Sequence, residues 1–211
     1  MEPLDKNKKP NDSEFYFLNY SYNFFLDILE ETRGESFWQK DPYYRLNRTR
    51  DAFLIYSEIL EYEPVGWFLE ALKTNRPPME AEMSKEFLLF VRNLLIHFPF
   101  FKSWDEVKFT KDLINWSKPG KSIDKFLSRF TGHEEFKCRV WNPEKKVMTY
   151  ISVNFPSVYT KDSEIYLKNL LPEKEGIIFF MSLMWNVLSS QVDSIVAVED
   201  GEKREYEMNK S

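Results

Sequence analysis

The sequence predicts a mainly α-helical protein, a helical bundle with one β-hairpin inserted in its C-terminal half. Apolar residues recur at helical spacing through most of the first 130 residues. Alternating apolar and polar residues, the pattern of a half-buried strand, surround a turn sequence within about 135–155. The 211 residues are 43% hydrophobic and 17% aromatic, which is enough to bury the core of one domain.

The helices expected in the first 130 residues are delimited by glycine and proline. Gly34 stops the first helix, the pair Pro77-Pro78 closes the third, and the pair Pro119-Gly120 separates the last two. The expected helices are 14–32, 42–62, 65–73, 79–98, 105–116 and 123–130.

The helix expected over 79–98 is central in the predicted bundle. It is polar at its start and apolar nearly all round in its second half, and a helix that is apolar on all sides is surrounded by other elements. Phe98 precedes Pro99, and a residue before proline is pushed out of the helical region. We therefore expect this helix to end or kink at His97.

The character of the chain changes at residue 136. Residues 136–140 and 147–155 alternate with a period of two on either side of the turn sequence 142–145, so they predict a β-hairpin. Cys138 falls on the inner face of the first strand, where we interpret it as a core residue.

Two further helices are expected after the hairpin, over 163–171 and 176–193. The predicted organisation is a single domain over 14–196, between a flexible N-terminal arm at 1–13 and a charged C-terminal tail at 197–211.

Composition excludes several classes of protein. The formal net charge is −5, so the molecule as a whole is not a basic nucleic-acid coat. Its one cysteine forms no internal disulfide and agrees with a reducing cytosol. The longest apolar block, 176–188, falls short of the roughly 20 residues of a membrane span, and residues 1–13 do not resemble a signal peptide. We expect a soluble, cytoplasmic protein without a membrane partner.

The candidate catalytic residues are Arg92, Asn93 and His97, the only polar side chains in the apolar run 87–101. A guanidinium and an imidazole in such a run cost several kcal/mol if they are buried without partners. Either each has a partner, or the three side chains line an opening onto water.

Their helical spacing indicates a division of roles. Asn93 and His97 are four residues apart and share a face, so the amide can orient the imidazole. A histidine at a helix C-terminus is favoured in its protonated form by about 0.3–1 kcal/mol and suits acid/base work. An arginine nearby can stabilise the charge that grows on a phosphate during cleavage without a metal.

The hexapeptide Arg-Asn-Leu-Leu-Ile-His at 92–97 resembles the R-x4-6-H signature of HEPN domains, including the polar residue after the arginine. The resemblance covers about 14–130 and leaves the hairpin and the helix after it outside. It implies an α-helical bundle, a dimer with its cleft at the interface, and Arg92 and His97 as the catalytic pair, assisted by Asn93. Some HEPN toxins carry a tyrosine two residues after the histidine, as a site of modification; here that position is Pro99.

HEPN ribonucleases occur among toxin–antitoxin, abortive-infection and CRISPR-associated proteins. The resemblance therefore implies a metal-independent endoribonuclease that needs no cofactor, with RNA, a second copy of the chain and an antitoxin or defence partner as its partners. Three alternatives remain open. The first is a non-catalytic helical module that binds a protein or nucleic acid. The second is a core histidine held by Asn93, with Arg92 reaching a surface carboxylate. The third is a helical scaffold in which the hairpin is the binding element.

A basic segment follows the motif directly. Residues 102–130 carry seven basic and four acidic side chains in a chain whose net charge is negative, and they include Trp104 and Trp116. Such a surface can track a phosphate backbone while an exposed indole stacks a base; the alternative is a solvated helix face with both tryptophans in the core. The candidate nucleic-acid-binding residues are Lys102, Trp104, Lys108, Lys111, Lys118 and Lys121.

Two smaller features carry weaker signals. Arg45, Arg48 and Arg50 form a second basic cluster with the same two interpretations. His133 lies in the loop before the hairpin without companions at ligand spacing, so we expect no metal site there.

Overall fold

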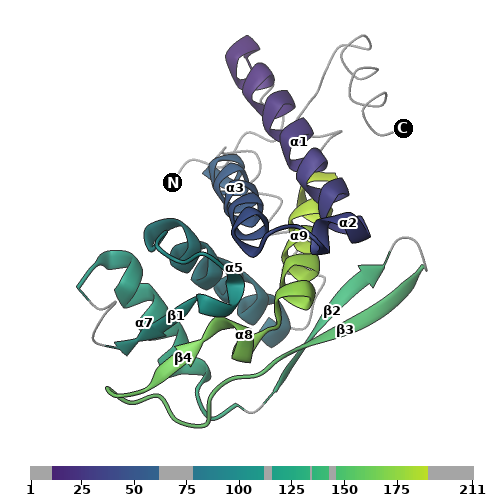
Figure 1. The fold of residues 1–211 in the computed structure, drawn as a ribbon. Coiled ribbons are helices and arrows are strands. Elements are labelled where there is room, and N and C mark those ends of the chain that lie inside the picture. Colours follow the sequence, from purple (N-terminus) through teal and green to yellow (C-terminus); the bar gives the residue numbers. More distant parts are fainter. Residues whose placement is uncertain (1–10, 62–77, 112–115, 134, 143–145, 190–211) are drawn as a thin grey trace.

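The computed structural model describes residues 11–61, 78–111, 116–133, 135–142 and 146–189 and is mostly helical over this part of the chain (Figure 1). Its α-helices are α1 (Asp12–Arg33), α2 (Glu35–Trp38), α3 (Pro42–Glu61), α5 (Pro78–His97), α7 (Lys118–Phe130), α8 (Leu167–Leu170) and α9 (Glu173–Ser189). A 3-10 turn, η1 (Trp104–Glu106), precedes the short strand β1 (Lys108–Thr110). The other strands are β2 (Phe136–Asn142), β3 (Val147–Val153) and β4 (Glu164–Tyr166).

Helix α5 lies at the centre and packs against α7, α3 and β2 (Figure 1). The ring of Phe87 is the focus of this packing, because aromatic rings reach it from two other helices and from the end of the hairpin. Its centroid is 5.9 Å from that of Phe126 on α7, 5.3 Å from that of Phe180 on α9 and 6.4 Å from that of Phe155 after β3. The apolar second half of α5 is therefore buried by partners on most sides, as its sequence predicts.

The predictions for α1, α3, α5 and the hairpin are confirmed. Asn11 caps α1 through a reciprocal capping box with Glu14, and Gly34 ends the helix. Strands β2 and β3 pair antiparallel with Cys138 opposite Ile151, and the Cys138 side chain is fully buried. Of the arm predicted over 1–13, residues 12 and 13 are already helical; 1–10, the helix predicted over 65–73 and the tail at 197–211 lie outside the described residues.

The helix predicted over 105–116 is wrong in its described part. Val107 and Phe109 are buried while Lys108 between them is exposed, and residues 108–110 form β1. This strand pairs antiparallel with β4, where Phe109 lies opposite Ile165. The helix predicted over 163–171 is correspondingly replaced by β4 followed by the single turn α8. Pairing between segments far apart in the sequence overrides the local helical pattern.

The break predicted at Pro119-Gly120 is also wrong, because both residues lie in the first turn of α7. Ser117 caps this helix, its hydroxyl accepting the Gly120 N–H at 3.1 Å. Proline is tolerated in a first turn because no intrahelical acceptor exists there for its missing N–H. Helix α7 therefore begins at Lys118 and extends to Phe130.

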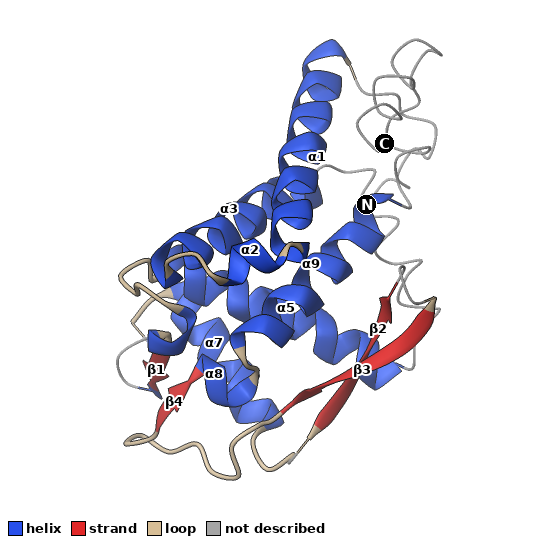
Figure 2. Ribbon diagram, turned by 45° about the vertical axis from the view of Figure 1, so that its right-hand side comes forward, coloured by secondary structure: helices blue, strands red, loops and turns tan. Residues whose placement is uncertain are grey.

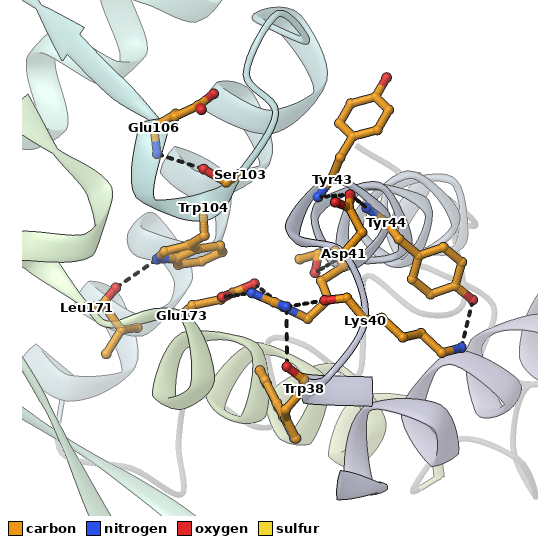
Figure 3. A network of polar contacts seen from close by, with 12 residues as sticks. Trp38, Lys40, Asp41, Tyr43, Tyr44, Ser103, Trp104, Glu106, Leu171 and Glu173 are labelled. Carbon is orange, nitrogen blue, oxygen red and sulfur yellow. Dashed lines mark hydrogen bonds and ion pairs between the residues drawn. The ribbon is translucent and has the colours of Figure 1, made fainter. Parts of the chain in front are cut away.

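Trp104 joins η1 to the start of α9. Its indole is 1% exposed and donates from Nε1 to the Leu171 carbonyl at 2.9 Å (Figure 3). Gly176 lies so close to the ring that a Cβ built on this glycine would stand 2.7 Å from Trp104 Cζ2. The absence of a side chain at 176 is therefore what lets the indole seat against α9.

Gly176→Ala is expected to lower the free energy of unfolding by about 1–3 kcal/mol, because the methyl group forces the indole or α9 to shift. Gly34→Ala is the matched control, since a Cβ there meets only the Glu31 carbonyl and Ser36 Oγ, both at 3.5 Å. Thermal and urea melts of the two variants give the comparison. Equal stability of both variants would contradict the tight contact at Trp104.

Candidate functional site

The candidate motif occupies the last two turns of α5, where the helix emerges from the core. Val91, Leu94 and Leu95 are buried, whereas His97 is exposed and is the last helical residue. The N–H of Phe98 still donates to the Leu94 carbonyl at 3.2 Å. The predicted helix end at His97 is confirmed, and the imidazole is accessible to solvent at the negative end of the helix dipole.

Arg92 is half-buried and faces α3. Its Nε donates to Ser57 Oγ at 3.0 Å, and the Ser57 hydroxyl in turn donates to the Phe53 carbonyl at 2.6 Å. Ser57 is itself buried, so the pair fixes the inner edge of the guanidinium. Among the described residues Arg92 has no carboxylate partner, and the bond from Nε to Ser57 is the contact that fixes its guanidinium. An arginine fork is suited to a phosphate.

Ser57 is the partner of Arg92 that the sequence pattern missed. The only signal for it is a small hydroxyl residue on the mostly apolar buried side of α3, where Thr49 is also buried. Such a residue commonly bonds back to a carbonyl of its own helix, as Ser57 does to Phe53, and nothing local announces the second bond to Arg92.

Asn93 does not hold His97 in this structure. Its side chain is 8% exposed and buried in the core, while His97 is exposed, and no hydrogen bond joins the two among the contacts of the described residues. The shared face predicted from their spacing is present, but the orienting bond expected from it is not. Because His97 is exposed, it is not the packed core histidine of the alternative interpretation.

Arg92 and His97 are separated on their helix. Five residues correspond to a rise of about 7.5 Å and a rotation of about 140°. The two side chains therefore leave α5 in different directions, Arg92 toward α3 and His97 from the helix end. One phosphate bound by both groups needs either a long reach by the arginine or a contribution from a second copy.

The surface near the motif has apolar exposure. On α5, Leu89 and Ile96 flank Arg92 at helical spacing and are partly buried. Leu54, three residues before Ser57 on α3, is 51% exposed. Phe100, three residues after His97, is 63% exposed. Large apolar side chains that stay exposed beside a charged group are typical of a surface that binds a partner.

The basic segment splits into core, paired and open residues. Trp104 belongs to the core, so its indole is not available to stack a base, and its prediction as a nucleic-acid contact is wrong. Lys108 pairs with Glu164, and Lys111 lies 3.9 Å from Asp124. Of the candidate nucleic-acid-binding lysines, Lys102, Lys118 and Lys121 are exposed and have no ion pair with another described residue.

Trp116 has the opposite fate from Trp104. It is 78% exposed and lies just before Ser117, the cap of α7, with Lys118 and Lys121 in the next turn. This end of α7 combines an exposed indole with two open lysines and is the part of the basic segment that retains the composition of a nucleic-acid contact.

The arginine cluster of α3 is structural. Arg45 makes a two-bond fork with Glu173, both at 2.8 Å, and also donates to the Trp38 and Lys40 carbonyls (Figure 3). Arg48 donates to Glu31 at 2.9 Å, and Arg50 donates to the Phe101 carbonyl at 2.9 Å. These guanidinium groups are used inside the protein, so the interpretation as a nucleic-acid surface does not apply to them.

Two further predictions concern metals and membranes. His133 is exposed and its ring centroid lies 5.4 Å from that of Phe136. Within the described residues, His, Cys, Asp and Glu side chains nowhere gather in threes in a way that could hold a metal ion. Every helix in the described part of the chain is too short or too polar to span a bilayer.

Comparison with known proteins finds no family model that matches the chain, no similar curated protein and no similar solved structure. The site is therefore argued from its own residues.

Glu31, which accepts a bond from Arg48 of this cluster, has a lowered pKa that makes its contribution to stability depend on pH. Partial burial alone would raise the pKa of Glu31, but hydrogen bonds from Lys40, Tyr44 and Arg48 outweigh this effect and lower the pKa from 4.5 to about 2. A carboxyl with a lowered pKa in the folded state stabilises the fold above its ordinary pKa, and the contribution disappears as the pH falls toward the folded value.

Glu31→Gln is therefore expected to lower the melting temperature at neutral pH, with the difference from wild type shrinking as the pH falls from about 5 to about 2. The exposed neighbour Glu30 supplies the matched control, Glu30→Gln, for which we expect little change. Melts followed by circular dichroism across this range provide the measurement. A Glu31→Gln difference that is independent of pH would rule out the ion-pair network as its source.

Proposed function

We propose that this protein is a metal-independent endoribonuclease of HEPN type in which Arg92 and His97 act on RNA. The observation that supports the proposal most is the state of Arg92. It is half-buried, anchored by Ser57 through Nε, and without a carboxylate among the described residues. Arg45, in contrast, is paired with Glu173. A guanidinium that is fixed through Nε by a neutral hydroxyl is a suitable group to meet an external anion through its Nη donors.

The chemistry proposed at this site is transesterification. The 2′-hydroxyl of one nucleotide loses its proton and attacks the adjacent phosphorus, while the bond from phosphorus to the 5′-oxygen of the next nucleotide breaks. The products are a 2′,3′-cyclic phosphate and a 5′-hydroxyl, which receives a proton. Arg92 stabilises the negative charge on the phosphorane, and His97 takes or supplies a proton.

The reaction needs both a base and an acid, and the motif offers one histidine per chain. A two-fold dimer that brings two motifs together supplies the second imidazole and removes the difficulty that Arg92 and His97 leave one helix in different directions. We accordingly propose a homodimer burying at least about 1,000 Å², with the exposed Leu54 and Phe100 near its interface. Asn93 is buried and supports the helix rather than the substrate.

The proposed biological context is a toxin or a phage-defence effector acting in the cytoplasm, with an antitoxin or defence protein as a further partner. A second candidate function is a non-catalytic module that binds nucleic acid through the start of α7. Exposed Trp116 with Lys118 and Lys121 favours it, because stacking and phosphate contacts need no catalytic pair. The two candidates differ in whether RNA is cut.

His97→Ala is expected to fold normally, since the side chain is exposed, and to lose RNA cleavage by about 10²-fold or more, the scale of a general acid or base. His133→Ala is the matched control, being the other exposed histidine of the chain. Cleavage of labelled RNA in the presence of EDTA measures both variants, and wild type should retain its activity there. Full activity of His97→Ala, or abolition of wild-type activity by EDTA, would refute this mechanism.

Arg92→Lys is expected to reduce cleavage sharply while changing the melting temperature by a few degrees at most, because lysine keeps the charge but loses the planar fork. Arg45→Lys is the contrasting control. It breaks the fork to Glu173, so stability should fall while the activity of the folded fraction is unchanged. Cleavage rates and thermal melts of both variants give the result. A loss of stability in Arg92→Lys with activity falling only in proportion would make Arg92 structural.

A further inference from the structure

Strand β3 presents an edge whose backbone groups face away from its only strand partner in the described chain. The N–H of Arg139 on β2 donates to Glu80 Oε1 at 3.1 Å, so the backbone of Arg139 points away from β3. Arg139 lies opposite Tyr150, and in an antiparallel pair of this type both residues direct their N–H and C=O outward. By alternation, Met148 and Ser152 also point outward from β3. Asn154, two residues after Ser152, agrees with this alternation, because its N–H also points away from β2 and donates to the Leu170 carbonyl at 2.9 Å.

The two edges of the hairpin differ in what covers them. The described helices that pack on it, α5 and α9, contact β2, and Glu80 bonds the outer edge of β2. The hairpin of β2 and β3 lies at one side of the helices (Figure 2). The first four side chains of β3 are exposed, with Val147 44%, Met148 47% and Tyr150 63% exposed, whereas Val153 at its end is buried.

The sequence of β3 also lacks the features that normally protect an edge. Residues 147–153 contain no charge, proline or glycine, whereas β2 carries Lys137 and Arg139. Lysine, proline and inward charges are what keep natural edge strands from pairing with another chain. An uncharged seven-residue edge with outward N–H and C=O groups is a template for one more strand.

We propose that β3 pairs antiparallel with β3 of a second copy, about a two-fold axis at Tyr150. This register pairs every outward-facing residue of the strand, with Tyr150 opposite itself and Met148 opposite Ser152, for about six hydrogen bonds. On the same strands Val147 meets Val153 and Thr149 meets Ile151, which are favourable cross-strand pairs. The paired segment ends before Asn154, whose N–H bonds Leu170 of its own chain, and no two like charges face each other within 147–153. This self-complementarity points to a second copy as the occupant.

The pairing is independent of the proposed ribonuclease site. Glu80, which bonds β2, lies in the first turn of α5, and His97 ends the helix. Seventeen residues of helix separate them by about 26 Å. Pairing through β3 therefore neither requires nor supplies a shared active site.

Tyr150→Pro tests the proposal with little effect on the fold. The N–H that proline removes faces outward and makes no bond to β2, so the hairpin keeps its own ladder. Lys137→Pro is the matched control, because Lys137 lies opposite Ser152 and its N–H points outward on the other edge. Light scattering over a concentration series up to high micromolar should show a smaller assembly for Tyr150→Pro than for wild type, and the wild-type size for Lys137→Pro. A monomeric wild type, or a Tyr150→Pro variant that keeps the wild-type size, overturns the proposal.

A second pair of variants covers the case in which proline unfolds the hairpin. Because Tyr150 faces itself, Tyr150→Lys and Tyr150→Glu each place like charges together and should each dissociate the wild-type assembly. An equimolar mixture of the two should restore it by pairing opposite charges. If each variant is dissociated and the mixture stays dissociated, a strand other than β3 of a second copy, such as one from another protein, occupies the edge and the proposal fails.

Discussion

The burial of α5 is the constraint on which the rest of the structure depends. Phe87 sits where α7, α9 and the end of the hairpin converge, and Phe90 extends the contact to Phe109 on β1 at 5.4 Å between ring centroids. Each such aromatic contact adds about 0.5–1.5 kcal/mol beyond the area it buries. Partners occupy most of the surface of α5, so its polar side chains Ser84 and Asn93 are buried and Arg92 is half-buried against α3. His97, at the end of the helix, is exposed.

The polar contacts inside the fold follow from the same packing. Helix α9 supplies Phe179 and Phe180 to the core, and its first turn is fixed by Arg45 through Glu173. The Arg45 and Glu173 side chains are 13% and 19% exposed, so the pair is only partly solvated and is geometrically matched by two bonds. The same guanidinium binds the carbonyls of Trp38 and Lys40, which closes the turn between α2 and α3. Arg45 thus links α3 to α9 and to the turn after α2, and its charge is neutralised by Glu173.

The sequence predicts the long elements because each carries its own signal. An apolar period, Gly34 after the first helix and Pro99 after the last turn of α5 are enough to predict α1 and α5, and alternation predicts the hairpin. The prediction misses the cap at Asn11, which begins α1 two residues earlier than predicted. The three-residue strands β1 and β4 carry no comparable signal, since their partners lie about fifty residues away in the chain. Trp104 and Trp116 show the same limit for function. They belong to one basic segment and differ only in tertiary burial, 1% against 78% exposed, which no local pattern encodes.

The comparison between Arg92 and the arginines of α3 decides how the motif is interpreted. All four are positive side chains on helices of the bundle, and motif spacing alone distinguishes none of them from a structural residue. The structure separates them by their partners. Arg45 and Arg48 face carboxylates, and Arg50 binds the Phe101 carbonyl and Asn47. Among the described residues, the partner of Arg92 is the neutral hydroxyl of Ser57. A neutral anchor fixes position without cancelling charge, which is what a group that stabilises a growing negative charge requires.

Two contacts between copies are proposed, one at the motif at the end of α5 and one at β3 near its start. Their separation has a consequence for assembly. One two-fold contact at the motif and another at β3 lie about 26 Å apart along the helix, so a single interface does not satisfy both. A chain with two different two-fold interfaces does not close as a dimer; it continues into a larger assembly. Dimers formed at the motif would then be linked through β3, and loss of the β3 contact would shorten the assembly without separating paired motifs. On the two proposals together, the β3 contact sets the size of the assembly and the motif sets the rate of the proposed cleavage, so the two quantities can be measured separately.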